Sequence, residues 1–112
     1  MKDTVIVITR NGMGSAEPDL QRKLLGTYLT LLLENGTLPG AICFYTDGVR
    51  AVIEGSPVLD QLHELDRRGV HLIICQTCIN YFGLADRVRA GLVGGMGDIL
   101  AAQSAAAKVI TL

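Results

Sequence analysis

The fold is decided by Thr4–Thr9, TVIVIT, an unbroken run of β-branched residues close to the start of the chain. A run this apolar that ends in Arg10-Asn11-Gly12 is typical of a central parallel strand buried on both faces. Further strands are expected at 41–45, 70–75, 92–93 and 108–112, and helices at 18–34, 56–68, 79–88 and 98–107. The alternation predicts a single α/β domain over residues 1–112, a three-layer α/β/α sandwich with a mainly parallel sheet of about five strands.

Two of the helices carry more specific expectations. The first should begin with Pro18 in its first turn and end at Asn35-Gly36. Its sheet-facing residues are expected to be Leu20, Leu24, Tyr28, Leu31 and Leu32, whereas Leu25, Leu29 and Leu33 widen the apolar face and hint at a subunit interface. The second should have Ser56 as N-cap and Pro57 at its first position. The segment 49–54 is ambiguous and is assigned neither to a helix nor to a strand.

Composition narrows the classes of function. The 112 residues carry a net charge of -1, and the pI is about 6.0, so there is no electrostatic signature for nucleic acid or an anionic membrane. Mean hydropathy is +0.37, yet no apolar run is long enough to cross a bilayer, which implies burial within protein, some of it between subunits. An odd count of three cysteines is no disulfide framework, and with no signal-like N-terminus the expected location is the cytoplasm.

The chemistry of the chain is expected at Cys75-Gln76-Thr77-Cys78, where a buried strand meets a helix. Unpaired N–H groups and the dipole at a helix start favour a thiolate, which makes it a better nucleophile at neutral pH. The simpler alternative is that both thiols are packing residues, because free cysteine is among the most buried residue types. Cys43, inside a strand, is predicted to be core.

Other cofactor and metal chemistries are less well supported. A closed zinc site needs about four ligands, and His63 and His71 are poorly placed to complete one with the thiol pair, so we expect no metal and no bound cofactor. The loop Asn11–Ser15 lacks the third glycine of a dinucleotide fingerprint, and no Gly-Lys-Ser/Thr follows it. Its amides could still bind a small anion, or it could simply be a tight turn that needs positive φ.

Ligands of parallel sheets bind outside the carboxyl ends of the strands. That edge is expected to bring together residues 10–15, 45–50 and 75–82 in one cleft. The predicted catalytic residues are Cys75 and Cys78. The predicted substrate-cleft residues are Arg10, Asn11, Gly12, Gly14, Tyr45, Asp47 and Tyr81.

Four segments carry a family resemblance: 8–14 (ITRNGMG), 44–49 (FYTDGV), 54–56 (EGS) and 75–84 (CQTCINYFGL). Together they resemble the DsrE/DsrF-like family of small sulfur-relay proteins, most closely the C-terminal domain of the YedF-like group, described as sulfurtransferase-like and linked to selenium metabolism. The resemblance implies a persulfide carried on Cys75, with Cys78 as an addition typical of the YedF-like group. It also implies homo-oligomers or hetero-oligomers, often trimers or hexamers. YedF-like proteins usually carry an N-terminal TusA-like domain that these 112 residues do not include, so a separate TusA-like carrier is an expected partner.

Three functions therefore compete. The first is a sulfur or selenium relay protein, a sulfurtransferase or persulfide carrier, in which Cys75 passes a persulfide sulfur to a partner. The second is an oligomeric binding module for a small anion or nucleotide, with the cysteines only lining the pocket. The third is an independent thiol-disulfide oxidoreductase, which is disfavoured because none of the three prolines, Pro18, Pro39 and Pro57, follows the cysteine pair.

Overall fold

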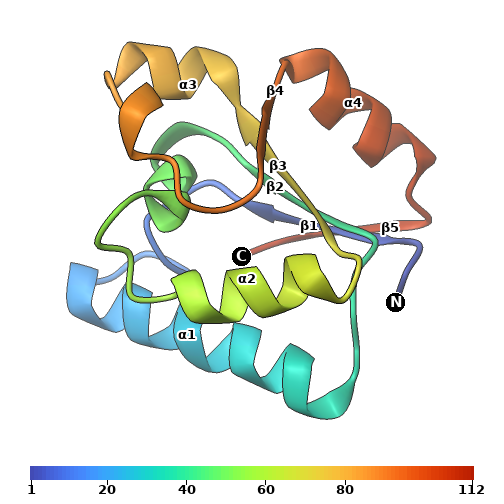
Figure 1. The fold of residues 1–112 in the computed structure, drawn as a ribbon. Coiled ribbons are helices and arrows are strands. Elements are labelled where there is room, and N and C mark those ends of the chain that lie inside the picture. The colour runs from blue at the N-terminus through green and yellow to red at the C-terminus, as the bar shows by residue number, and fades with distance from the viewer.

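The computed structural model describes residues 1–112 and contains one five-stranded sheet in which every neighbouring pair is parallel. Its strands are β1 (Thr4–Ile8), β2 (Ala41–Phe44), β3 (His71–Cys75), β4 (Leu92–Gly94) and β5 (Lys108–Thr111), in the spatial order β4-β3-β2-β1-β5. The helices α1 (Pro18–Asn35) and α2 (Leu59–Arg67) lie on one side of the sheet, and α4 (Met96–Ala105) lies on the other (Figure 1). The predicted α/β architecture is confirmed, and the sheet is entirely parallel.

The core is built on the central strands. All five residues of β1 and all four of β2 are buried, whereas β4 and β5 at the two edges are largely exposed. The register places Val7 of β1 opposite Cys43 of β2. Cys43 has no exposed surface, which confirms the prediction that it is a core residue.

The face of α1 that packs on the sheet differs from the expected one. Leu25, Leu29 and Leu32 are buried, whereas Leu20, Leu24 and Leu31 are each more than two-fifths exposed. Both sets recur at helical spacing, so periodicity alone allowed either face, and the prediction that Leu20, Leu24 and Leu31 contact the sheet was wrong. The helix bounds were right: Pro18 is in the first turn, and Gly36 ends the helix with φ of 64°.

The start of α2 also differs. Ser56 is not its N-cap: the helix begins at Leu59, and Val58 supplies the first helical carbonyl to the N–H of Leu62. The hydroxyl of Ser56 instead accepts a hydrogen bond from the N–H of Val58, so Ser56 and Pro57 form a turn ahead of the helix. The ambiguous segment before it is the 3-10 helix η1 (Thr46–Val52).

The segment after β3 is shorter and more broken than the expected helix at 79–88. The helix α3 (Gln76–Tyr81) starts directly after Cys75, and a single 3-10 turn, η2 (Ala85–Arg87), follows separately. Two bonds close α3: the N–H of Gly83 bonds to the carbonyl of Asn80, and that of Leu84 to the carbonyl of Ile79. This pattern satisfies the last carbonyls of a helix and stops it.

No helix in the structure combines the length and the apolar character needed to span a lipid bilayer.

Candidate thiol site at the carboxyl edge of the sheet

Cys75 occupies the predicted junction, as the last residue of β3 and the N-cap of α3. Cys75 is only 1% exposed to solvent. The backbone N–H of Cys78 lies 3.4 Å from the Cys75 Sγ and donates a hydrogen bond to it. The start of α3 therefore directs an N–H dipole at this sulfur, as the sequence predicted.

Cys78 is the more accessible thiol, because it is only partly buried. Burial raises the pKa of Cys78, the hydrogen bond between its thiol and Cys75 raises it further, and the N–H of Thr46 acts in the opposite direction. The net pKa of Cys78 is above its ordinary value. Cys78 is therefore protonated at neutral pH and can donate its S–H proton to Cys75.

Thr46 connects the ends of two further strands to this pair. Its N–H lies 3.1 Å from the Cys78 Sγ, and it is the only non-glycine residue with positive φ, at 49°. Its hydroxyl lies 2.7 Å from the carbonyl oxygens of Thr9 and Tyr45, which share its single proton. A left-handed conformation costs a β-branched residue about 1–2 kcal/mol, and these bonds hold Thr46 in it.

Gly48 allows η1 to sit on the end of β1. A Cβ at this position would be 1.9 Å from the carbonyl oxygen of Ile8, so no residue with a side chain fits. The close approach places Thr46, at the start of η1, beside the thiols.

Arg50 projects from η1 toward α3. Its guanidinium carbon lies 4.3 Å from the centre of the Phe82 ring, which is within cation–π range, and its Nε lies 3.2 Å from Oδ1 of Asp47. Tyr81 contacts Phe82 edge to face, but it is 85% exposed. Tyr81 therefore does not cover the thiols within one chain, whereas Arg50 stacks on Phe82, whose N–H bonds to the carbonyl of Cys78.

The glycine loop is fastened to α1. The N–H of Met13 donates to the carbonyl of Gln21, and the N–H of Ala16 donates to the Gln21 side chain. Gly12 has φ of 139°, and a Cβ there would be 2.4 Å from the Gln21 backbone. Gly12 is therefore a close-packed turn residue, and the amides of Met13 in the loop and of Ala16 just after it are already bonded.

The predicted cleft residues separate into two groups. Arg10, Asn11 and Asp47 line a hollow of about 400 Å³ together with Ser15, Pro18, Gln21, Arg22 and Arg50. A second hollow of about 510 Å³ shares Asn11, Arg22 and Arg50 with the first. Gly12, Gly14, Tyr45 and Tyr81 line neither one.

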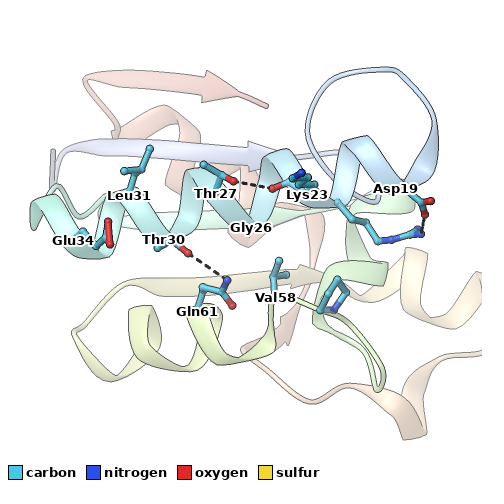
Figure 2. Close-up of a pocket in the computed structure, with 11 residues that line it drawn as sticks. Asp19, Lys23, Gly26, Thr27, Thr30, Leu31, Glu34, Val58 and Gln61 are labelled. Atoms are coloured by element: carbon cyan, nitrogen blue, oxygen red, sulfur yellow. Dashed lines mark hydrogen bonds and ion pairs between the residues drawn. The ribbon is translucent and has the colours of Figure 1, made fainter.

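The largest cavity, about 580 Å³, lies away from the cysteines, between α1 and α2. Figure 2 shows side chains of the two helices facing each other across it, with Gln61 donating to the Thr30 hydroxyl over 3.4 Å. Its lining is mostly polar, and no cysteine contributes to it. Position at the strand ends, not volume, therefore marks the candidate site.

The histidines lie outside the site. Nε2 of His63 is 2.7 Å from the carbonyl oxygen of Arg89, and His71 begins β3, at the opposite end from Cys75. No three His, Cys, Asp or Glu side chains are grouped so that they could hold a metal ion.

Sequence reasoning missed the roles of Thr46, Gln21 and Arg22. Thr46 falls within FYTDGV, but nothing in a sequence shows that a threonine adopts positive φ. Gln21 and Arg22 lie on a helix whose inward face was assigned differently. If the buried face of α1 had been assigned correctly, the sequence could have placed Gln21 and Arg22 beside the loop.

Comparison with known proteins shows the family and the fold of the chain. The family model described as DsrE/DsrF-like matches residues 4–112, so the chain belongs to that family. Three solved structures share the fold: YchN from E. coli, MTH1491 from Methanobacterium thermoautotrophicum and BT1422 from Bacteroides thetaiotaomicron. YchN has a TM-score of 0.71 at 19% identity over 100% of both chains. MTH1491 has 0.70 at 19% over 97% of both, and BT1422 has 0.64 at 18% over 98% of this chain and 95% of its own. A search of curated proteins finds no match.

Proposed function

We propose that this protein is a small sulfur or selenium relay protein that carries a persulfide on Cys75 and transfers it to a partner in the cytoplasm. The observation that carries the proposal is the position of Cys75, whose sulfur accepts the N–H of Cys78 at the start of α3. Membership of the DsrE/DsrF-like family supports it. A sulfur anion is stabilised at such a position, because a helix start supplies N–H donors and the positive end of the dipole.

The transfer needs no metal or external oxidant. The Cys75 thiolate attacks the outer sulfur of a donor persulfide, R–S–SH. The S–S bond of the donor breaks, and R–S⁻ leaves with the bonding electron pair. Cys75–S–SH then gives its outer sulfur to an acceptor thiolate in the same way, which restores the Cys75 thiolate.

Cys78 is auxiliary in this scheme. A thiol must lose its proton to act as a nucleophile, and the raised pKa of Cys78 keeps it protonated at neutral pH. Its proton is available to Cys75, while its N–H holds the Cys75 sulfur. Attack of Cys78 on the inner sulfur of Cys75–S–SH would release hydrogen sulfide and leave a disulfide, and this branch is expected to be slow.

The partner is proposed to approach at α3. Cys75 is 1% exposed, whereas Tyr81, at the end of the same helix, is 85% exposed. An incoming persulfide must therefore displace the Cys78 side chain or shift α3, and Tyr81 offers a partner an aromatic contact next to that opening. A TusA-like carrier is the proposed class of partner, and a homo-oligomer, a trimer or hexamer, is the proposed assembly.

Intact-mass spectrometry after incubation with a persulfide donor tests the assignment. The parent protein, Cys78→Ser and Cys43→Ser should each gain one sulfur atom that dithiothreitol removes, and Cys75→Ser should gain none. Cys43 is the matched control, because its buried thiol has a pKa raised to about 11. The absence of any adduct, or an adduct that survives in Cys75→Ser, would rule out the carrier role.

A second function, binding of a small anion or nucleotide without sulfur transfer, has one observation in its favour. Arg10, Arg22 and Arg50 line the two polar hollows, to which no cysteine contributes. A ligand found by thermal-shift screening that stabilises the Cys75→Ser, Cys78→Ser double variant as much as the parent would favour this second function.

A further inference from the structure

The two hollows lined by arginines form one polar depression. Asn11, Arg22 and Arg50 belong to both, and the volumes of about 400 and 510 Å³ fall in the range of small-molecule sites. Ile53 is the only aliphatic side chain of the second hollow apart from proline, and the first has none. We call this pair of hollows the arginine depression.

The arginine depression concentrates positive charge on a chain with net charge -1. Three guanidiniums line it, against the carboxylates of Asp47 and Glu54. Arg10 takes part in none of the ion pairs of the chain. Arg22 and Arg50 each meet one aspartate three residues away, Asp19 at 3.1 Å and Asp47 at 3.2 Å, through a single oxygen.

These two ion pairs leave donors available. Each is monodentate, and both carboxylates are largely exposed, so water and salt weaken them. A guanidinium offers five N–H donors arranged to bind carboxylate or phosphate oxygens in pairs. Arg22 and Arg50 can therefore turn their remaining N–H groups to an anion held between them.

The helix η1 ties the arginine depression to the thiols. Thr46 at one end of η1 donates its N–H to the Cys78 Sγ. Arg50, four residues later, lines both hollows and stacks on Phe82, whose N–H bonds to the carbonyl of Cys78. An anion held by Arg50 would thus lie beside the helix that carries the second thiol.

We propose that the arginine depression binds the anionic end of a small organic thiol, bearing two or more negative charges on carboxylate or phosphate groups, that is a sulfur donor or acceptor for Cys75. The identity of the ligand as a thiol rests on the proposed relay function. A small molecule fits better than an acidic protein, because the arginines line hollows that a flat protein surface would not fill. As donor, the ligand is a persulfide that loses its outer sulfur to the Cys75 thiolate and leaves as a thiolate.

Binding of unreactive probes separates this site from the transfer reaction. S-methylglutathione carries two carboxylates and no free thiol, and its diethyl ester, in which both carboxylates are masked and only the ammonium group is charged, is the matched control without anionic groups. S-methyl-4′-phosphopantetheine and S-methylpantetheine form the corresponding pair for phosphate. Isothermal titration calorimetry at low salt should show binding of the acid or the phosphate at least about tenfold tighter than its neutral counterpart, the effect expected for one charge-assisted hydrogen bond.

Variants locate the binding. Arg22→Gln and Arg50→Gln should each weaken the preferred anionic probe by about tenfold or more, as expected for loss of a guanidinium contact. Arg67→Gln, on α2 outside both hollows, and Cys75→Ser should leave its Kd unchanged. Equal binding of charged and neutral probes, or an unchanged Kd in both Arg22→Gln and Arg50→Gln, would overturn the proposal, as would binding of an acidic protein but of neither probe.

Formation of the sulfur adduct on Cys75 is measured in a separate experiment, by intact-mass spectrometry. If the probes bind as expected and no adduct forms from any persulfide, the anion site is supported and the relay function fails. If Cys75 takes sulfur from the persulfide of glutathione diethyl ester as fast as from that of glutathione, and likewise from the neutral and phosphorylated pantetheine persulfides, the relay function stands and the anion site is refuted.

Discussion

The backbone N–H of Thr46 lies 3.1 Å from the Sγ of Cys78, which joins the end of β2 to α3, the helix that follows Cys75. The contact exists because Thr46 is held at φ of 49°, with its hydroxyl on the Thr9 carbonyl. A single residue in an unfavourable conformation therefore connects the ends of β1 and β2 to the thiol pair of α3. Such strained residues are common at functional sites.

Thr46→Val tests the connection. Valine keeps the steric cost of positive φ and loses the hydroxyl, so we expect a loss of roughly 1–3 kcal/mol in the free energy of unfolding, measured in urea. Thr46→Gly relieves the strain and should lose less. Equal stability of the parent and Thr46→Val would show that the hydroxyl does not hold this turn.

The pKa of Cys78 should depend on Cys75. Burial is the larger cause of the raised pKa, and the hydrogen bond to Cys75 is the next. In Cys75→Ala the pH profile of Cys78 alkylation, read by mass spectrometry, should move to lower pH and still lie above the ordinary thiol value. An unchanged profile would mean that the two thiols do not interact.

Gly48→Ala should be strongly destabilising. The new Cβ would meet the Ile8 carbonyl oxygen at 1.9 Å, and displacement of backbone atoms in the core is expected to cost about 3 kcal/mol or more. Gly97→Ala is the matched control, because a Cβ there meets nothing within 4 Å. In the first turn of α4 it should change the free energy of unfolding by no more than about 0.5 kcal/mol. A similar effect at both positions would contradict the close approach of η1 to β1.

Glu64 should make stability depend on acid pH. Its side chain accepts hydrogen bonds from Arg67 and Arg68. These bonds, that of Arg67 having the larger effect and that of Arg68 the next, lower the pKa of Glu64 from 4.5 to about 2. In the unfolded chain Glu64 takes up a proton more readily than in the folded one. The stabilisation that ionised Glu64 gives to the folded state is therefore fully present above pH 4.5 and is lost as the pH falls toward 2. Glu64→Gln should flatten that part of the stability profile, whereas Asp66→Asn, which removes a carboxylate without an ion pair, should not.

We predict that Leu92 is part of an interface between copies of this chain. It is 79% exposed on the edge strand β4, close in sequence to Met96 and Leu100, which are 53% and 61% exposed. Leu92→Lys should shift sedimentation toward the monomer without unfolding the chain, and Thr111→Lys on the opposite edge strand is the control. A monomeric parent at tens of micromolar, or an unchanged assembly in Leu92→Lys, would refute this.

Much of the fold was predictable because its signals are local. The β-branched run at Thr4–Thr9 marked the central strand, and the alternation of strands and helices predicted the α/β class. Pro18 and Gly36 fixed α1 within a residue. The start of α2 was misplaced because a serine before a proline can either cap a helix or stabilise a turn. The hydrogen bond from the Val58 N–H to the Ser56 hydroxyl shows that here it stabilises a turn.

The sequence by itself determined that the first strand is buried at the centre of the sheet, that a strand ends at Cys75, and the family to which the chain belongs. Tertiary structure decided which face of α1 is buried, because two leucine sets had the same period and only contact with the sheet distinguishes them. It also decided that Thr46 bonds to Cys78 and Arg50 stacks on Phe82, while the Tyr81 side chain points into solvent. These contacts join residues about thirty positions apart, and their geometry depends on packing of η1 against β1, which no local pattern records.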